Sequence, residues 1–163
     1  MNEILLLGNS LYSHLSRFTG KDYLLLSDTP SALSVGNSMY FITLSDSITG
    51  DLHMSGVRDC YMSLQDALNM LMAELNRTFM LTIQINTVAI IIDNQGHYKL
   101  FDSHSQDSHG NVATTGKSIL LEFNGIEEVV QYLQSFYAAT SVVHFEICTH
   151  LPYDQNSMYK TNQ

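Results

Sequence analysis

The chain has 163 residues, of which 45% are hydrophobic and 14% are charged. This length and composition allow one domain with a substantial core and argue against disorder over most of the chain. Sixteen Asp and Glu against seven Lys and Arg give a net charge of −9. Proteins that bind nucleic acids neutralise phosphates with clustered Lys and Arg, so we expect no nucleic-acid partner. The acidity would suit a basic protein surface.

The cysteines and the apolar segments narrow the class of protein further. Two cysteines, Cys60 and Cys148, are too few for a disulfide framework or a Cys-rich zinc site. No segment approaches the roughly 20 apolar residues of a membrane-spanning helix, and Glu3 stands where a signal peptide would carry positive charge. We therefore expect a soluble cytoplasmic or nuclear protein with no membrane partner, no cofactor and no bound metal.

The first part of the chain predicts one helix and two strands. Helical spacing of apolar residues indicates a helix near residues 2–17. Strands are expected at 22–30 and 38–47, and the second of them is expected to be covered on both faces. A polar and irregular region is expected over residues 50–59.

The clearest helix is predicted over residues 63–76. Ser63 is suited to cap it, and Asp66 fits the third helical position. Its expected apolar face consists of Leu64, Ala67, Leu68, Leu71, Met72 and Leu75. A cap explains Ser63 better than a role as nucleophile.

The second half predicts an antiparallel meander, because short turns join runs of β-branched and aromatic residues. In chain order we expect strands at 79–85, 87–93, 98–102 and 118–123, a helix at 125–139 and a strand at 142–151. The fold class is α+β, an antiparallel sheet with flanking helices. We expect one domain over residues 1–152 and a loose tail over 153–163.

Several residue groups fit structural roles. Glu127 and Glu128 fit the first turn of a helix, where the helix dipole favours acids. His144 and His150 are expected on a polar face or at a strand end. Packing roles are expected for Met62, Met70, Met72 and Met80, and for Tyr132, Phe136 and Tyr137.

The stretch HYKLFDSHSQDSHG, residues 97–110, contains two Asp-x-His units. Side chains two apart share one face of a strand, so Asp102 at a strand end can orient the ring of His104 as a general base. A second interpretation is a metal site formed by Asp102, His104, Asp107 and His109, although such a site would lie on one flexible loop. A third is a polar surface loop, which composition alone would favour.

A family resemblance changes this weighting. The residues NTVAIIIDNQGHYKLFDSHSQDSHGN, followed by GKSILLEFNGIEEVVQYLQSFY, resemble the deubiquitinase of herpesvirus large tegument proteins, a papain-like cysteine protease family. The resemblance is closer to its relatives in transposable elements and other large DNA elements of animals. It covers residues 2–150 and includes ILLLGNSLYSHL, DYLLLSDTPSAL and YMSLQDALNMLMAE.

The resemblance implies a papain-like fold, ubiquitin or a ubiquitin-like protein as partner, His104 as the base and Asp102 as its orienter. Two features depart from the family pattern. Gln106 stands where the family usually has Arg. The family's nucleophile is a Cys preceded by Gln, N-terminal to the Leu-Leu-x-Gly block, but this chain has no Gln-Cys pair. We therefore expect a truncated or degenerate deubiquitinase domain without its nucleophile.

Alternatives remain open. Cys60 precedes the helix at Ser63, whose N-terminus would lower the thiol pKa, but the adjacent Asp59 would raise it. Cys148 lies on an apparent core strand and is a weaker candidate for a substitute nucleophile. The chain could instead be a non-catalytic ubiquitin-binding module, or a protein with a divalent-metal-binding loop. Whether this chain is itself an enzyme stays open at this point.

Overall fold

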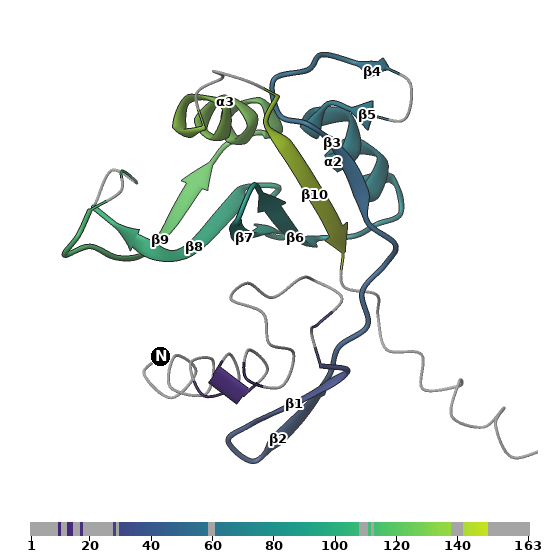
Figure 1. Ribbon diagram of the computed structural model, residues 1–163. Coiled ribbons are helices and arrows are strands. Elements are labelled where there is room, and N and C mark those ends of the chain that lie inside the picture. The colour runs from purple at the N-terminus through teal and green to yellow at the C-terminus, as the bar shows by residue number, and fades with distance from the viewer. Residues whose placement is uncertain are drawn as a thin grey trace, which may run out of the picture. The chain divides into compact units, whose positions relative to one another are not determined.

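The computed structural model describes residues 10, 13, 14, 17, 28, 30–58, 61–107, 111, 113–137 and 142–149. The chain divides into two compact units, one formed by Met1–Thr43 with Leu151–Gln163 and the other by Leu44–His150 (Figure 1). Of the expected first helix, the described residues Ser10, Ser13, His14 and Arg17 are helical. The tail at 153–163, and the strand at 22–30 apart from Asp28 and Pro30, lie outside the described residues.

In the first unit, β1 (Ala32–Val35) and β2 (Ser38–Phe41) form an antiparallel hairpin. Gly36 occupies its turn with φ +58°, a conformation that glycine adopts without strain. The prediction that this second strand is covered on both faces is wrong, because every residue of β2 is exposed. The strand belongs to a two-stranded sheet, so its apolar side chains reflect β propensity and not burial between layers.

The second unit is built on an eight-stranded sheet in the order β4-β5-β3-β10-β6-β7-β8-β9. All neighbouring strands are antiparallel except β3 and β5. The strands are β3 (Ile48–Asp51), β4 (Val57–Arg58), β5 (Tyr61–Met62), β6 (Thr78–Ile83), β7 (Asn86–Ile92), β8 (Tyr98–Gln106), β9 (Lys117–Phe123) and β10 (His144–Thr149).

The prediction of an irregular region at 50–59 is wrong in part, since it contains the end of β3 and all of β4. Gly50 explains how β3, which has no strong strand pattern in its sequence, forms an inner strand of the sheet. A Cβ at this position would overlap the carbonyl oxygen of Met62 and the ring of Phe145, so only glycine lets β3 lie between β5 and β10.

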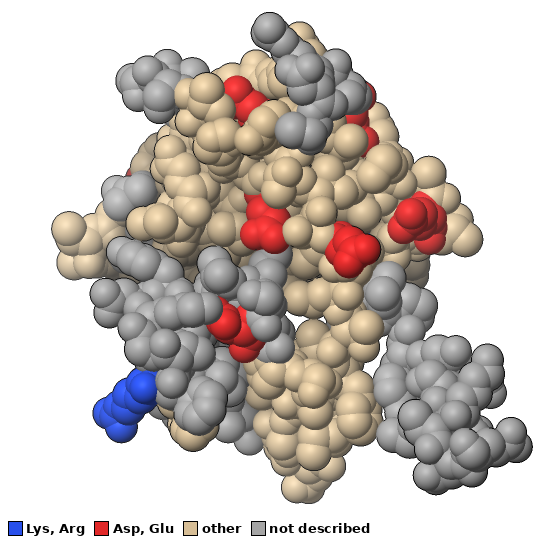
Figure 2. All heavy atoms as spheres, turned by 45° about the vertical axis from the view of Figure 1, so that its right-hand side comes forward, with Lys and Arg blue, Asp and Glu red and all other residues tan. Residues whose placement is uncertain are grey.

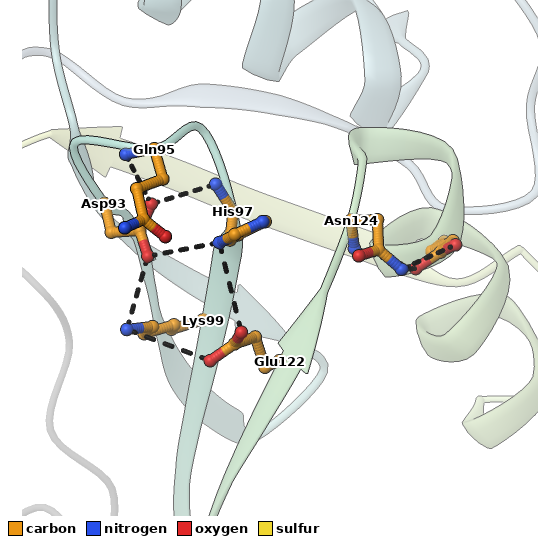
Figure 3. Close-up of polar contacts among 7 residues, drawn as sticks. Asp93, Gln95, His97, Lys99, Glu122 and Asn124 are labelled. Atoms are coloured by element: carbon orange, nitrogen blue, oxygen red, sulfur yellow. Dashed lines mark hydrogen bonds and ion pairs between the residues drawn. The ribbon is translucent and has the colours of Figure 1, made fainter.

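The predicted meander is confirmed as β6-β7-β8-β9. Gln84, with φ +57°, lies in the two-residue turn between β6 and β7. The next turn is held by Asp93, whose Oδ1 accepts backbone N–H groups from Gln95 at 2.8 Å and His97 at 3.0 Å (Figure 3). Lys99 then forms ion pairs with Asp93 and Glu122, so charges from β8 and β9 surround this turn (Figure 3).

Two helices pack on the sheet and on each other: α2 (Leu64–Ala73) contacts β3 and β10, and α3 (Ile126–Phe136) contacts β8 and β9. The core between them contains Leu64, Ala67, Leu68 and Leu71 of α2 and Ile126, Val129, Val130 and Leu133 of α3. Glu127 and Glu128 lie in the first turn of α3, as predicted. No helix in the described part of the chain is both long and apolar enough to cross a membrane.

The N-terminus of α2 is confirmed, but its C-terminus differs from the prediction. Ser63 caps the helix, since its Oγ accepts the backbone N–H of Asp66 at 3.1 Å. The helix ends three residues early because Leu75 takes a left-handed φ of +63° and lies 82% exposed. Met70 is also exposed, against the prediction that it packs, whereas Met62, Met72 and Met80 are at least partly buried.

Candidate active site

The Asp-x-His unit lies within β8, at an irregularity in its pairing with β9. Asp102 pairs with Ile119, and Gln106 pairs with Lys117. Between these two pairs, β8 advances by four residues and β9 by two. The prediction that Asp102 ends its strand is therefore wrong, because β8 continues to Gln106. A bulge of this kind re-aims side chains, and here His104 lies inside it.

Asp102 and His104 are in direct contact. Oδ1 of Asp102 lies 2.6 Å from Nδ1 of His104 and also accepts the backbone N–H of His104 at 2.8 Å. A carboxylate only accepts hydrogen bonds, so Nδ1 carries the ring proton and Nε2 is the basic nitrogen. The Asp102 side chain is 6% exposed and the His104 side chain is 45% exposed. A buried carboxylate thus contacts an accessible imidazole.

Gln106 completes the surroundings of the Asp102 carboxylate. Its side chain is buried, and its Nε2 donates a hydrogen bond to Oδ2 of Asp102. Sequence reasoning left the role of Gln106 open. The signal that could have found it is the two-residue strand period, which puts residues 102, 104 and 106 on one face.

Gly116, in the segment that resembles the tegument family, permits a close approach between two backbones. A Cβ on Gly116 would overlap the peptide atoms of Gln106. Lys117 at the start of β9 pairs with the same residue. The lack of a side chain at Gly116 therefore lets the chain before β9 lie close to the end of β8. This close approach is at Gln106, whose side chain donates to Asp102.

A pocket of about 450 Å³ opens beside this pair of side chains. Residues from four parts of the second unit line it: Asn86, Asp102, His104, Gln106, Ala113, Thr114, Phe136 and Tyr137. Only Asp102 and His104 were predicted as site residues. The pocket is large enough for an extended peptide end, but not for a folded partner as a whole.

Two tyrosines near the pocket stay neutral at physiological pH. Burial, together with the negative charge of Asp102, raises the pKa of Tyr132 to about 12. Burial also raises the pKa of Tyr137, and a hydrogen bond with Asn86 offsets part of that increase. As predicted, Tyr132, Phe136 and Tyr137 pack in or near the core, because each is partly buried. Of these three, Phe136 and Tyr137 line the pocket, and their rings give one wall of it an apolar character.

The second Asp-x-His unit differs from the first. Oδ1 of Asp107 accepts the backbone N–H of Asn111 at 3.0 Å, and the Asp107 N–H donates to the Asn111 carbonyl at 2.8 Å. Asp107 is thus bonded to Asn111 through its side chain and its backbone, and His109 lies outside the described residues. Within the described ranges, no three His, Cys, Asp or Glu side chains converge as metal ligands.

Of the two cysteines, Cys148 lies among the described residues. Cys148 is 1% exposed on β10, and burial, followed by the charge of Glu146, raises its thiol pKa. A buried thiol with a raised pKa is a poor nucleophile. Cys60 and His150 lie outside the described residues, and His144 is exposed at the first position of β10.

This α+β fold is the class that the sequence predicted, and it resembles a viral protease of known structure. That structure is described as "the ubiquitin-specific protease encoded by murine cytomegalovirus tegument protein M48 in complex with" a ubiquitin-based suicide substrate. The TM-score is 0.66 at 16% sequence identity, over 88% of this chain and 61% of that one. This chain therefore spans about 61% of the length of its structural neighbour.

A match of the sequence to a family model shows the family of this chain. The family model for the herpesvirus tegument protein, N-terminal conserved region, matches residues 1–156. The chain belongs to this family. Comparison with curated proteins found no match. Kinship with relatives in transposable elements is not tested by these comparisons and stays a prediction.

Proposed function

We propose that this chain is a deubiquitinase-like domain in which His104 is the general base and Asp102 orients it. The observation that carries the proposal is the 2.6 Å contact between Asp102 Oδ1 and His104 Nδ1, which leaves Nε2 as the basic nitrogen. The buried carboxylate and the exposed ring beside a pocket support it. Family membership and the likeness to a ubiquitin-specific protease support ubiquitin as the substrate.

The chemistry would be that of a cysteine-type deubiquitinase. Nε2 of His104 accepts a thiol proton, and the thiolate attacks the carbonyl carbon of ubiquitin's C-terminal glycine. The bond to the leaving amine breaks, the imidazolium gives this amine its proton, and a thioester remains. His104 then takes a proton from water, whose oxygen attacks the thioester carbonyl. The carbon–sulfur bond breaks, ubiquitin leaves with a free carboxyl group, and the imidazolium returns its proton to the thiolate. Asp102 stabilises the imidazolium at each stage.

The finer part of the proposal is that this chain provides the base and its orienter, but no nucleophile of its own. Burial and the raised pKa of Cys148 support this, because neither permits a reactive thiolate. Cys60 is the remaining candidate. Its place before the capped helix α2 favours a reactive thiol, but the adjacent Asp59 opposes it. A cytoplasmic or nuclear location, where thiols stay reduced, belongs to the same proposal.

A ubiquitin probe with a C-terminal thiol-reactive electrophile tests the finer part. The chain, Cys60→Ala and Cys148→Ala are incubated with it, and adducts are read by intact mass. We expect no adduct from any of the three folded proteins. An adduct that is lost in Cys60→Ala and slowed in His104→Ala would show that Cys60 is the nucleophile. It would overturn this part of the proposal and keep His104 as the base.

A second candidate function is ubiquitin binding without catalysis. The neighbouring structure contains a ubiquitin-based substrate, and acidic side chains predominate among the charges of described residues visible in Figure 2. Attraction between this surface and a basic patch on ubiquitin would weaken with added salt. Calorimetric titrations with ubiquitin at low and high ionic strength show whether the chain binds ubiquitin and whether charge attraction contributes to the binding. Binding independent of salt would refute the electrostatic part, and no binding at high micromolar ubiquitin would refute the binding module.

A further inference from the structure

Three donors satisfy the buried carboxylate of Asp102, and all of them come from β8. Oδ1 accepts the backbone N–H and the Nδ1–H of His104, and Oδ2 accepts the side-chain amide of Gln106. Asp102 is 4% exposed and Gln106 is 2% exposed, so water does not compete for these contacts. The rotamer of the carboxylate is therefore fixed from two sides.

We propose that Gln106 is a positioning residue, whose amide holds the Asp102 carboxylate in the orientation that keeps the ring proton of His104 on Nδ1. This inference rests on the proposed function for its catalytic meaning, because it assigns a residue to the Asp102–His104 pair. Without the amide, the carboxylate can rotate about its side-chain bonds, and the ring loses its fixed partner. Nε2 would then no longer be held as the basic nitrogen.

The orientation of the Gln106 amide is the one that a contact with the Asp102 carboxylate favours. Among the described residues, Gln106 Oε1 is the buried side-chain oxygen or nitrogen that lacks a hydrogen-bond partner. Turning the amide over would put this oxygen against the Asp102 carboxylate, and two acceptors repel each other. The amide thus keeps its donor on Asp102 although its own oxygen stays unpaired, which is costly for a buried carbonyl.

The backbone around Gln106 is held as firmly as its side chain. Its peptide lies against Gly116, where a Cβ would not fit, and it pairs with Lys117 across the two strands. Between Asp102 and Gln106 the register of β8 against β9 shifts by two residues, and Gln106 is paired with Lys117 in the shifted register. The donor is therefore presented from a fixed point and does not depend on a mobile loop. A positioning role needs this rigidity, because a small displacement of an orienting group weakens its effect.

The charge of Gln106 also fits this role. A neutral amide donates to Oδ2 without cancelling the charge of the carboxylate. Asp102 can then stabilise an imidazolium at His104 with its full negative charge.

Nitrogen NMR of the His104 ring tests the inference in the whole chain, without ubiquitin or a nucleophile. Spectra recorded across pH sample the neutral ring, and His104→Gln assigns its signals. In the wild type, we expect the neutral ring to carry its proton on Nδ1. In Gln106→Met, which keeps the size but removes the donor, we expect a mixture in which the Nε2–H form rises severalfold. An unchanged tautomer in a folded Gln106→Met protein would overturn the inference.

Gln134→Met is the matched control. Gln134 also donates its amide N–H, to the carbonyl of Leu52 at 2.8 Å, so this variant loses a comparable hydrogen bond elsewhere in the same unit. We expect it to leave the His104 tautomer unchanged. If both variants shift the tautomer equally, the effect is a general loosening and the inference is wrong.

A measurement on the wild type covers the case in which Gln106→Met does not fold. The side-chain amide protons of Gln106 should exchange with water about tenfold or more slowly than those of exposed Gln95, and Asp102→Asn should accelerate them. Equal exchange at the two glutamines would contradict the inference. A positive result here with no ubiquitin binding would leave the positioning role intact and refute only the proposed function.

Discussion

Gly116 lies so close to Gln106 that a methyl group on its α-carbon would overlap the Gln106 peptide. This contact joins the start of β9 to the end of β8 beside Asp102. The site is therefore shaped by the absence of a side chain at one position as much as by the polar groups around it. A new Cβ that meets backbone atoms costs more stability than one that meets the end of a flexible side chain, because the side chain can move aside.

Gly116→Ala should destabilise the protein by about 1–3 kcal/mol, because backbone and not a side-chain tip would have to move. Chemical denaturation measures the change. Gly125→Ala is the control: its backbone is extended, with φ −161°, and the nearest atom to a new Cβ is the flexible Glu127 carboxylate at 3.2 Å. A smaller loss is expected there. Equal losses at both positions would contradict the close approach as the cause.

Asp102 and Gln106 should be energetically coupled. Asp102→Asn puts an amide donor where hydrogen-bond donors converge, and Gln106→Met removes one of these donors. We expect each change to cost about 1–3 kcal/mol, and the double variant to cost less than the sum by about 1 kcal/mol or more. Urea unfolding of the four proteins gives the cycle. Additive losses would mean that the two side chains do not interact in solution.

Alkaline unfolding should depend on Tyr132. The pKa of Tyr132 is raised from 10.0 to about 12 in the folded protein, first by burial and then by nearby negative charge. The unfolded chain therefore releases this proton at lower pH than the folded chain, and stability falls as pH rises from about 10 to 12. Tyr132→Phe should flatten this part of the stability curve. An unchanged slope would show that Tyr132 does not contribute.

Cys148 should resist thiol reagents in the folded protein. It is buried on an inner strand, and burial raises its pKa, so little accessible thiolate forms near neutral pH. We expect labelling by a maleimide to proceed only as fast as the protein opens, and to accelerate sharply in denaturant. Cys60→Ala isolates this cysteine for the measurement. Rapid labelling under native conditions would contradict the described burial.

Local patterns predicted much of the second unit. The cap at Ser63 and the apolar face of α2 are local features, and hairpin turns set the meander. Tertiary contacts decided the rest. Residues 48–51 form a strand because Gly50 lets β3 lie between its neighbours, and the chain around Gly50 carries no strong strand pattern. The exposed face of β2 shows the converse, a strand pattern without burial.

The candidate site divides in the same way. The contact between Asp102 and His104 follows from their spacing and was predicted, whereas their catalytic roles stay a prediction. The irregular pairing of β8 with β9 was missed, because a bulge depends on the partner strand. Asn86 and Tyr137 line the pocket from other elements, so no spacing along the sequence could link them to His104.

The most direct test of the central claim is an NMR titration of the isotope-labelled chain with ubiquitin, and with ubiquitin lacking its C-terminal glycines. If the pocket beside His104 receives the ubiquitin C-terminus, the signals of His104, Thr114 and Tyr137 should shift with intact ubiquitin and stay nearly unchanged with the shortened form. The turn at Asp93, at the other end of β8, should stay unchanged in both (Figure 3). Equal shifts with both ubiquitins, or none at the pocket, would contradict the account.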